Sequence, residues 1–187
     1  MERRSTLLGV LLVATALAIP GIALAGDHAF VGSSKCKKCH IKQYNAWAET
    51  KMAKAFEGLK PGVAAEAKTK AKLDPQKDYT ADAACVGCHV TGFGKPGGFK
   101  DIASTPDLAG VGCESCHGAG ADYITDDKMS LKNKEYKRAD IVAAGMTDKV
   151  QDACGGCHND KSPFWPGSFA FDKDKGSHAH EALKYPH

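Results

Sequence analysis

The sequence has 187 residues, of which 43% are hydrophobic and only 7% aromatic, and its formal net charge is +3. This length suits one ordinary domain, and the weak charge excess, with no recognisable nucleic-acid module, argues against a nucleic-acid-binding protein. Two tryptophans and seven phenylalanines are few for a core of this size. We therefore expect something other than side chains to fill part of the interior.

Residues 1–25 are predicted to be an export signal peptide. Two arginines precede an apolar run over residues 7–24, and small residues before Ala25 predict cleavage after it. The expected mature domain is therefore 26–187, which has 162 residues, a net charge of +2 and a periplasmic location. The alternative is a retained membrane anchor, which Pro20, late in the run, disfavours. No later segment is apolar enough to span a membrane after cleavage.

The first motif of the mature chain is CKKCH, and the C-x-x-C-H pattern recurs as CVGCH, CESCH and CGGCH, using all eight cysteines. Structural zinc, disulfides and redox C-x-x-C pairs do not require a histidine at the next position. Covalent c-type haem uses every position, because two thiols form thioethers and the histidine becomes the proximal iron ligand. We predict four covalently bound c-type haems. The expected attachment sites are Cys36, Cys39, Cys85, Cys88, Cys113, Cys116, Cys154 and Cys157, and the expected proximal ligands are His40, His89, His117 and His158.

Helical periodicity follows the first motif. Residues 41–59 place apolar side chains on one face, and Lys60-Pro61-Gly62 ends the predicted helix. A second helix, rich in Ala and Lys, is predicted on the surface over residues 63–73.

The rest of the chain alternates glycine-rich loops with short helices. The run GFGKPGG, residues 92–98, is predicted to be a loop whose backbone passes close to a flat cofactor. Short helices are expected over residues 139–144, before Gly145, and over residues 178–183. With no confident strand, we expect a mainly α fold with extensive loops, a multihaem cytochrome c fold in which haems form much of the core.

Residues 30–120 closely resemble the cytochrome c-554 family of tetrahaem electron carriers. The most specific stretches are KPGVAAEAKTKAKLDPQKDYTADAACVGCHVTGFGKPGG and GVGCESCHGAG, and the likeness continues more loosely to the final HAHEAL segment. The resemblance implies a periplasmic, mostly helical fold. It also implies that the haem on the second motif has only its proximal histidine, His89, and is open to a small molecule.

The resemblance also implies distal ligands, and here the sequence departs from the family. Met52 stands where the family has a histidine that ligates the fourth haem, and it is either a ligand or a core residue. The histidine expected for the first haem is missing, and Met129 is the nearest replacement, with Met146 a weaker one. His178, in preference to His180, is the candidate for the third haem. His28 and His187, near the mature ends, are expected to be exposed and unliganded.

The predicted function is electron transfer between redox proteins, with no catalytic residue. The resemblance implies an upstream multihaem oxidoreductase and a downstream cytochrome or membrane quinone enzyme. The alternative function is a small-molecule (nitric oxide) reductase at the open five-coordinate haem, and a third is a structural subunit of a larger cytochrome assembly. Two groups of basic residues could dock an acidic partner or could simply be solvated: Lys35, Lys37, Lys38 and Lys42, and Lys132, Lys134, Lys137 and Arg138.

Overall fold

A computed structural model describes residues 27–164 and residue 170 of the protein. The described chain is made of short helices joined by long loops, and it contains no strand, only an isolated antiparallel bridge between Val90 and Ala109. This confirms the predicted mainly α fold with extensive loops. In chain order the elements are α1 (Ser33–Lys37), α2 (Ile41–Ala48), η1 (Ala55–Leu59), α3 (Ala65–Lys70), α4 (Ala83–His89), η2 (Pro106–Leu108), α5 (Cys113–His117), α6 (Arg138–Ala143) and η3 (Val150–Gly156), where η marks a 3-10 helix.

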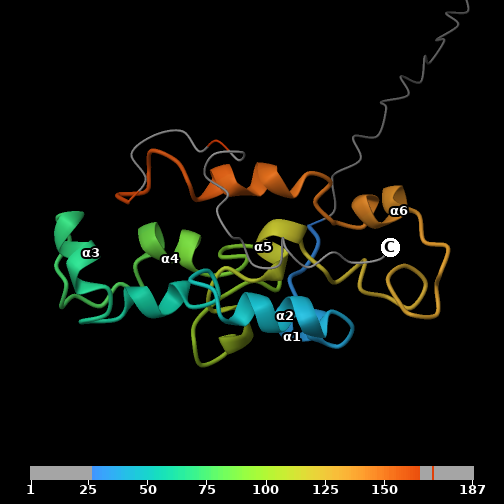
Figure 1. Cartoon of the computed structure of the whole chain (residues 1–187), viewed down its shortest axis with the longest axis horizontal. Helices are drawn as coiled ribbons and strands as arrows, with labels where there is room; N and C mark the ends of the chain where they lie inside the picture. The colour runs from blue at the N-terminus through green and yellow to red at the C-terminus, as the bar shows by residue number, and fades with distance from the viewer. Residues whose placement is uncertain (1–26, 165–169, 171–187) are drawn as a thin grey trace, which may run out of the picture.

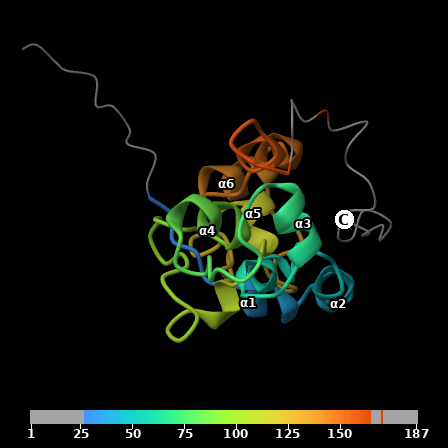
Figure 2. The same cartoon turned by 90° about the vertical axis from the view of Figure 1, so that its left-hand side faces the viewer.

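The short helix α5 lies in the middle of the molecule. In Figure 1, η3, drawn in orange, lies on one side of α5, and α1 and α2 lie on the other. Figure 2, turned by 90°, shows the same order, and both α1 and η3 pack against α5. Helices α3 and α6 lie at opposite ends of the molecule. The third C-x-x-C-H segment, which forms α5, is therefore placed between the first and the fourth.

Residues 41–59 do not form the single regular helix that their periodicity predicts. α2 ends early, where the Thr50 hydroxyl donates to the Trp47 carbonyl at 2.7 Å. Such local side-chain hydrogen bonds compete with continuation of a helix. After this turn the Met52 carbonyl accepts a hydrogen bond from the Val111 amide at 2.9 Å. A contact with a distant segment thus fixes the chain between α2 and η1, and the single-helix prediction was wrong.

The other predicted helices that can be compared are present but short. The helix predicted over residues 63–73 is α3, which is mostly exposed except for the buried Lys68. The helix predicted over residues 139–144 is α6, and it stops before Gly145, whose φ of 106° is left-handed. The expected helix over residues 178–183 lies outside the described residues.

The hydrophobic core is thin and divided. One cluster joins η1, α4 and the chain around residue 99, with the Phe56 and Phe99 rings 5.4 Å apart. The second cluster joins the loop after α5 to α6. The buried members of the first are Phe56, Leu59, Tyr79, Val86, Val90, Phe99 and Leu108, and those of the second are Tyr123, Ile141 and Ala144.

A loop is present over residues 92–98 as predicted, and its glycines allow close packing within the protein, while the approach of its backbone to a flat cofactor stays a prediction. A Cβ atom on Gly98 would collide with the backbone of Gly92, and one on Gly92 would press on the Phe30 ring at 2.7 Å. The loop therefore closes on itself and on the segment before α1. Within residues 27–164 and residue 170, no helix is long and apolar enough to cross a membrane. The predicted signal peptide, residues 1–25, lies outside this range.

Candidate haem-binding site

Each C-x-x-C-H segment contains a helical turn that gathers its three chemical groups. In the first segment the His40 amide donates to the Cys36 carbonyl at 2.9 Å, and in the fourth the His158 amide donates to the Cys154 carbonyl at 2.9 Å. The second and third segments lie within α4 and α5. Residues three and four apart share one face of such a turn, and none of the cysteines, all of which lie within the described residues, is in a disulfide. The local structure therefore presents two thiols and an imidazole together, as thioether attachment of haem requires.

The first and third segments lie against each other. α1 packs on α5, and the thiols of Cys36 and Cys113 are close enough for a weak hydrogen bond to affect both pKa values. This bond lowers the pKa of the Cys113 thiol to about 7, while the same contact and burial raise the pKa of the Cys36 thiol. The Ser33 hydroxyl also accepts from the Cys113 amide at 3.3 Å. Two predicted attachment sites, 77 residues apart in the sequence, are thus in direct contact.

The second and fourth segments are paired in a similar way. Burial raises the pKa of the Cys157 thiol to about 12, helped by a hydrogen bond and repulsion from Cys88. The fourth segment also lies against the third, because η3 packs on α5. Burial raises the pKa of the Cys116 thiol, and the nearby Cys154 adds a smaller contribution. The four segments therefore form one connected group, with the third at its centre.

A cavity of about 510 Å³ is lined by the first and third segments. This volume lies within the range of about 300–1,000 Å³ that is typical of cofactor sites. Most of its wall is apolar, with aromatic rings from Tyr44, Trp47 and Tyr123. The cysteines and histidines of the two segments also line it: Cys36, Cys39, His40, Cys113, Cys116 and His117. The cavity has the size, the apolar wall and the reactive groups that haem attachment needs.

His89, in the second segment, is held in one orientation. Its Nδ1 lies 2.7 Å from the Ala55 carbonyl of η1. A carbonyl only accepts, so Nδ1 carries the proton and donates it. In the neutral ring the other nitrogen, Nε2, then has the free lone pair, which is the tautomer an iron-ligating histidine needs. The contact also ties α4 to η1, which pack together.

Comparisons with known proteins agree with this geometry. The family described as cytochrome c554 and c-prime matches residues 35–118. Cytochrome c-554 of Nitrosomonas europaea is 46% identical over 156 residues, which is 80% of this chain and 66% of that protein's length. The solved structure of reduced cytochrome c554 from Nitrosomonas europaea matches with a TM-score of 0.72 and 40% identity, over 82% of this chain and 85% of that chain. The chain belongs to the cytochrome c-554 family. It is therefore a c-type cytochrome with covalently bound haem, and the predicted family and fold are confirmed.

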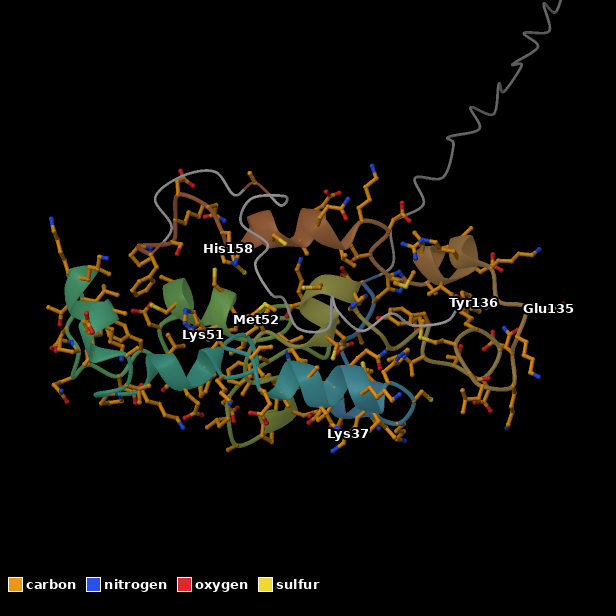
Figure 3. All side chains as sticks on the ribbon, in the orientation of Figure 1. Lys37, Lys51, Met52, Glu135, Tyr136 and His158 are labelled. Carbon is orange, nitrogen blue, oxygen red and sulfur yellow. The ribbon has the colours of Figure 1, made fainter. Side chains whose placement is uncertain are left out.

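The candidate distal ligands of this cytochrome are partly brought together. Met52, Met129 and Met146 all line the cavity between the first and third segments. Met129 and Met146 also pack against the cluster of Tyr123 and Ile141. In Figure 3, Met52 follows α2 and lies on the side of its segment toward His158, although His158 does not line the cavity. The candidates His178 and His180 lie outside the described residues.

His28 differs from its predicted exposed state. Its Nδ1 lies 2.7 Å from a carboxylate oxygen of Asp122, and its side chain is only 25% exposed. The ring also lies against Gly145, where a Cβ atom would approach it to 2.7 Å. Proximity to the predicted mature end did not leave this histidine free, because the N-terminal segment packs over the loop that follows α5. His187 lies outside the described residues.

The basic residues around the first segment remain exposed, as solvation or docking would require. Lys35, Lys37, Lys38 and Lys42 are all exposed, and Figure 3 shows Lys37 at the edge of the molecule. Lys37 lies 4.7 Å from the centre of the Tyr44 ring. In the second basic group, Lys132 pairs with Asp126 at 3.5 Å, and Arg138 pairs with Asp148 at 3.2 Å. The charges of Lys132 and Arg138 are therefore compensated by neighbouring carboxylates of the same chain.

Two charged side chains near the attachment cysteines were missed by sequence analysis. Glu114 occupies a variable position inside the third C-x-x-C-H segment, and Lys68 lies on the helix predicted to be at the surface, yet both are buried. Neither position carries a pattern that marks it. The one indication in the sequence is that a charged residue, Glu114, stands between two cysteines whose thiols must face an apolar cofactor.

Proposed function

We propose that this chain is a periplasmic tetrahaem cytochrome that carries electrons between redox proteins. The observation that supports this best is the arrangement of the four C-x-x-C-H segments. α1 and η3 both pack on α5, and Cys88 of the second segment lies near enough to Cys157 of the fourth to add to the rise in its pKa that burial causes. Redox centres anchored in one connected group favour passage of electrons from one to the next. The periplasmic location rests on the predicted signal peptide, residues 1–25, ahead of the mature domain, 26–187.

The roles proposed for the side chains follow from their chemistry. The eight cysteines are the thioether anchors, and His40, His89, His117 and His158 are the proximal ligands. When bound, haem supplies one-electron iron chemistry. The protein fixes the imidazoles, as Ala55 does for His89. The aromatic and methionine side chains on the cavity wall exclude water, which keeps rearrangement during electron transfer small.

The distal positions are proposed to differ among the four sites. Met129 is the proposed sixth ligand at the first segment, supported by its place on the wall of the cavity that His40 also lines. Met52 is proposed at the fourth segment, because it stands where the family has the histidine that ligates the fourth haem. His178 is proposed for the third. The second site, held by His89, is proposed to have no distal protein ligand. A His/Met pair raises the reduction potential relative to bis-histidine, so these replacements favour higher potentials than the family pattern gives.

The proposed partners are an upstream multihaem oxidoreductase and a downstream cytochrome or membrane quinone enzyme. Exposed lysines around the first segment, Lys35, Lys37, Lys38 and Lys42, would suit an acidic partner surface. Binding through such exposed charges weakens as salt rises.

The function is tested on the purified native protein. We expect a haem assay to give four haems per chain, and a redox titration to be fully reversible. Electron paramagnetic resonance of the oxidised protein should show one high-spin iron, at His89, and nitric oxide should perturb that signal without being consumed. A different haem count would contradict the tetrahaem assignment. Catalytic consumption of nitric oxide would replace the carrier function with that of a reductase.

Methionine ligation is tested by the near-infrared charge-transfer band of a methionine–iron bond. We expect the native protein to show this band, and Met129→Ala and Met52→Ala each to remove part of its intensity. Met146→Ala, from the same cavity wall, is the matched control and should keep the full band. If Met146→Ala loses intensity and Met129→Ala does not, Met146 is the ligand at the first segment. Absence of the band from the native protein would dismiss methionine ligation.

A further inference from the structure

Two charged side chains of opposite sign are buried in the described part of the chain. Glu114 is 2% exposed and Lys68 is 3% exposed. Burying a charge is costly unless it is compensated by hydrogen bonds or by another charge. Each of these residues has such compensation. Glu114 is next to the attachment cysteine Cys113, and Lys68 lies over Tyr79, whose core cluster also contacts Cys85.

Glu114 lies between the two cysteines of the third segment, and backbone amides hold its carboxylate. One oxygen accepts from the Val31 amide at 3.0 Å and from the Gly120 amide at 2.7 Å. The other accepts from the Gly32 amide at 2.8 Å. Three amides from two loops thus compensate the negative charge without neutralising it. The carboxylate also lies near the first segment, because Val31 and Gly32 directly precede α1, which packs on α5.

Lys68 holds the opposite charge near the second segment. Its ammonium donates to the Lys60 carbonyl at 2.6 Å and lies 5.4 Å from the centre of the Tyr79 ring. Tyr79 belongs to the core cluster against which Cys85 packs. No carboxylate of the described chain lies within ion-pair distance of Lys68, although its charge, after hydrogen bonds from Thr80, helps to lower the pKa of the exposed Asp78. Lys77 and Asp82, which also act on Cys85 with opposite signs, form a partly exposed ion pair 3.7 Å apart.

The sign of each effect follows from Coulomb's law. Oxidised haem iron carries one more positive charge than reduced iron, so a fixed anion stabilises the oxidised form and a fixed cation stabilises the reduced form. Charges act more strongly inside a protein than at its surface, because the effective dielectric constant is lower and salt does not screen them. A buried charge beside an attachment cysteine is therefore placed to shift the reduction potential.

We propose that Glu114 and Lys68 are potential-setting residues that bias the centre and the α4 end of the cytochrome in opposite directions. Glu114 lowers the potential at the first and third segments, and Lys68 raises it at the second. The bias favours flow of electrons from the centre of the molecule, at α5, toward the α4 end. This inference rests on the proposed attachment of haem at Cys36, Cys113 and Cys85.

The proposal is tested by redox titration of fully loaded Glu114→Gln and Lys68→Met proteins. Both substitutions remove the charge at nearly constant side-chain volume. We expect Glu114→Gln to move at least one midpoint to higher potential and none to lower. Lys68→Met should move the midpoint of the high-spin iron at His89 to lower potential. The matched controls are Glu49→Gln, whose side chain is 84% exposed, and Lys70→Met, exposed on the same helix as Lys68, and neither should move a midpoint.

A conservative variant separates charge from packing. Glu114→Asp keeps the negative charge but shortens the reach to Val31 and Gly120, so we expect a lower unfolding temperature with midpoints close to native. Unchanged midpoints in well-folded Glu114→Gln or Lys68→Met would overturn the proposal, as would shifts of the same sign in both. If Glu114→Gln fails to fold, large midpoint shifts in Glu114→Asp would overturn it. A native haem count other than four would instead overturn the proposed function.

Discussion

Replacing both cysteines of the third segment is expected to be far more damaging than replacing both cysteines of the fourth. Cys113→Ala/Cys116→Ala should fail to accumulate as a folded protein, whereas Cys154→Ala/Cys157→Ala should accumulate with one haem fewer. The difference follows from position. α5 packs against both α1 and η3 and borders the cavity of about 510 Å³, while η3 contains no buried residue.

The energetic argument is that loss of the central cofactor leaves a cavity that the thin core cannot fill by collapse. We expect a loss on the order of 5 kcal/mol, comparable to the whole stability of many domains. Yield, intact mass and thermal unfolding of the two double variants measure the effect. Equal yields and equal unfolding temperatures would show that the third segment is not the structural centre.

The parts of the site that could be predicted are those fixed by covalent chemistry. Thioether attachment needs two thiols and a histidine at set spacing, so CKKCH and its three repeats carry the information locally. The glycine-rich loop and the end of α6 at Gly145 were also predictable, because they depend on backbone conformations that few residues adopt.

The parts that could not be predicted depend on contacts between distant segments. The break after α2 is fixed by Val111 and Met52, whose hydrogen bond joins segments far apart in the sequence. His28 is paired with Asp122 for the same reason. Periodicity describes one element at a time, so it reports neither kind of contact.

The buried charges illustrate this limit most clearly. Lys68 reads as a solvated residue on a Lys-rich helix, and only the fold shows that it lies over Tyr79. Glu114 reads as a variable residue within a motif, yet three amides from two other parts of the chain surround it. Their burial follows from the tertiary structure alone, which is why they became visible only with the fold.

Ile141→Ala is expected to give the largest loss of stability among single substitutions outside the haem-binding segments. Ile141 is 1% exposed, is the buried residue of α6, and packs with Tyr123 and Ala144. Truncation of a fully buried isoleucine costs about 2–5 kcal/mol. Chemical unfolding of the fully loaded protein measures this, with Leu131→Ala, at an 81% exposed position, as the control that should change stability by less than about 0.5 kcal/mol.

The same substitution separates two roles of the cluster around Ile141. Met129 and Met146 pack against this cluster from the cavity side, so a hole at position 141 lets both methionines shift. If Met129 ligates iron, Ile141→Ala should weaken the near-infrared methionine band as well as the stability. If the cluster only packs, stability should fall by the same amount with the band unchanged. A stability change below about 1 kcal/mol would contradict the placement of Ile141 in the core, because so small a loss is typical of surface positions.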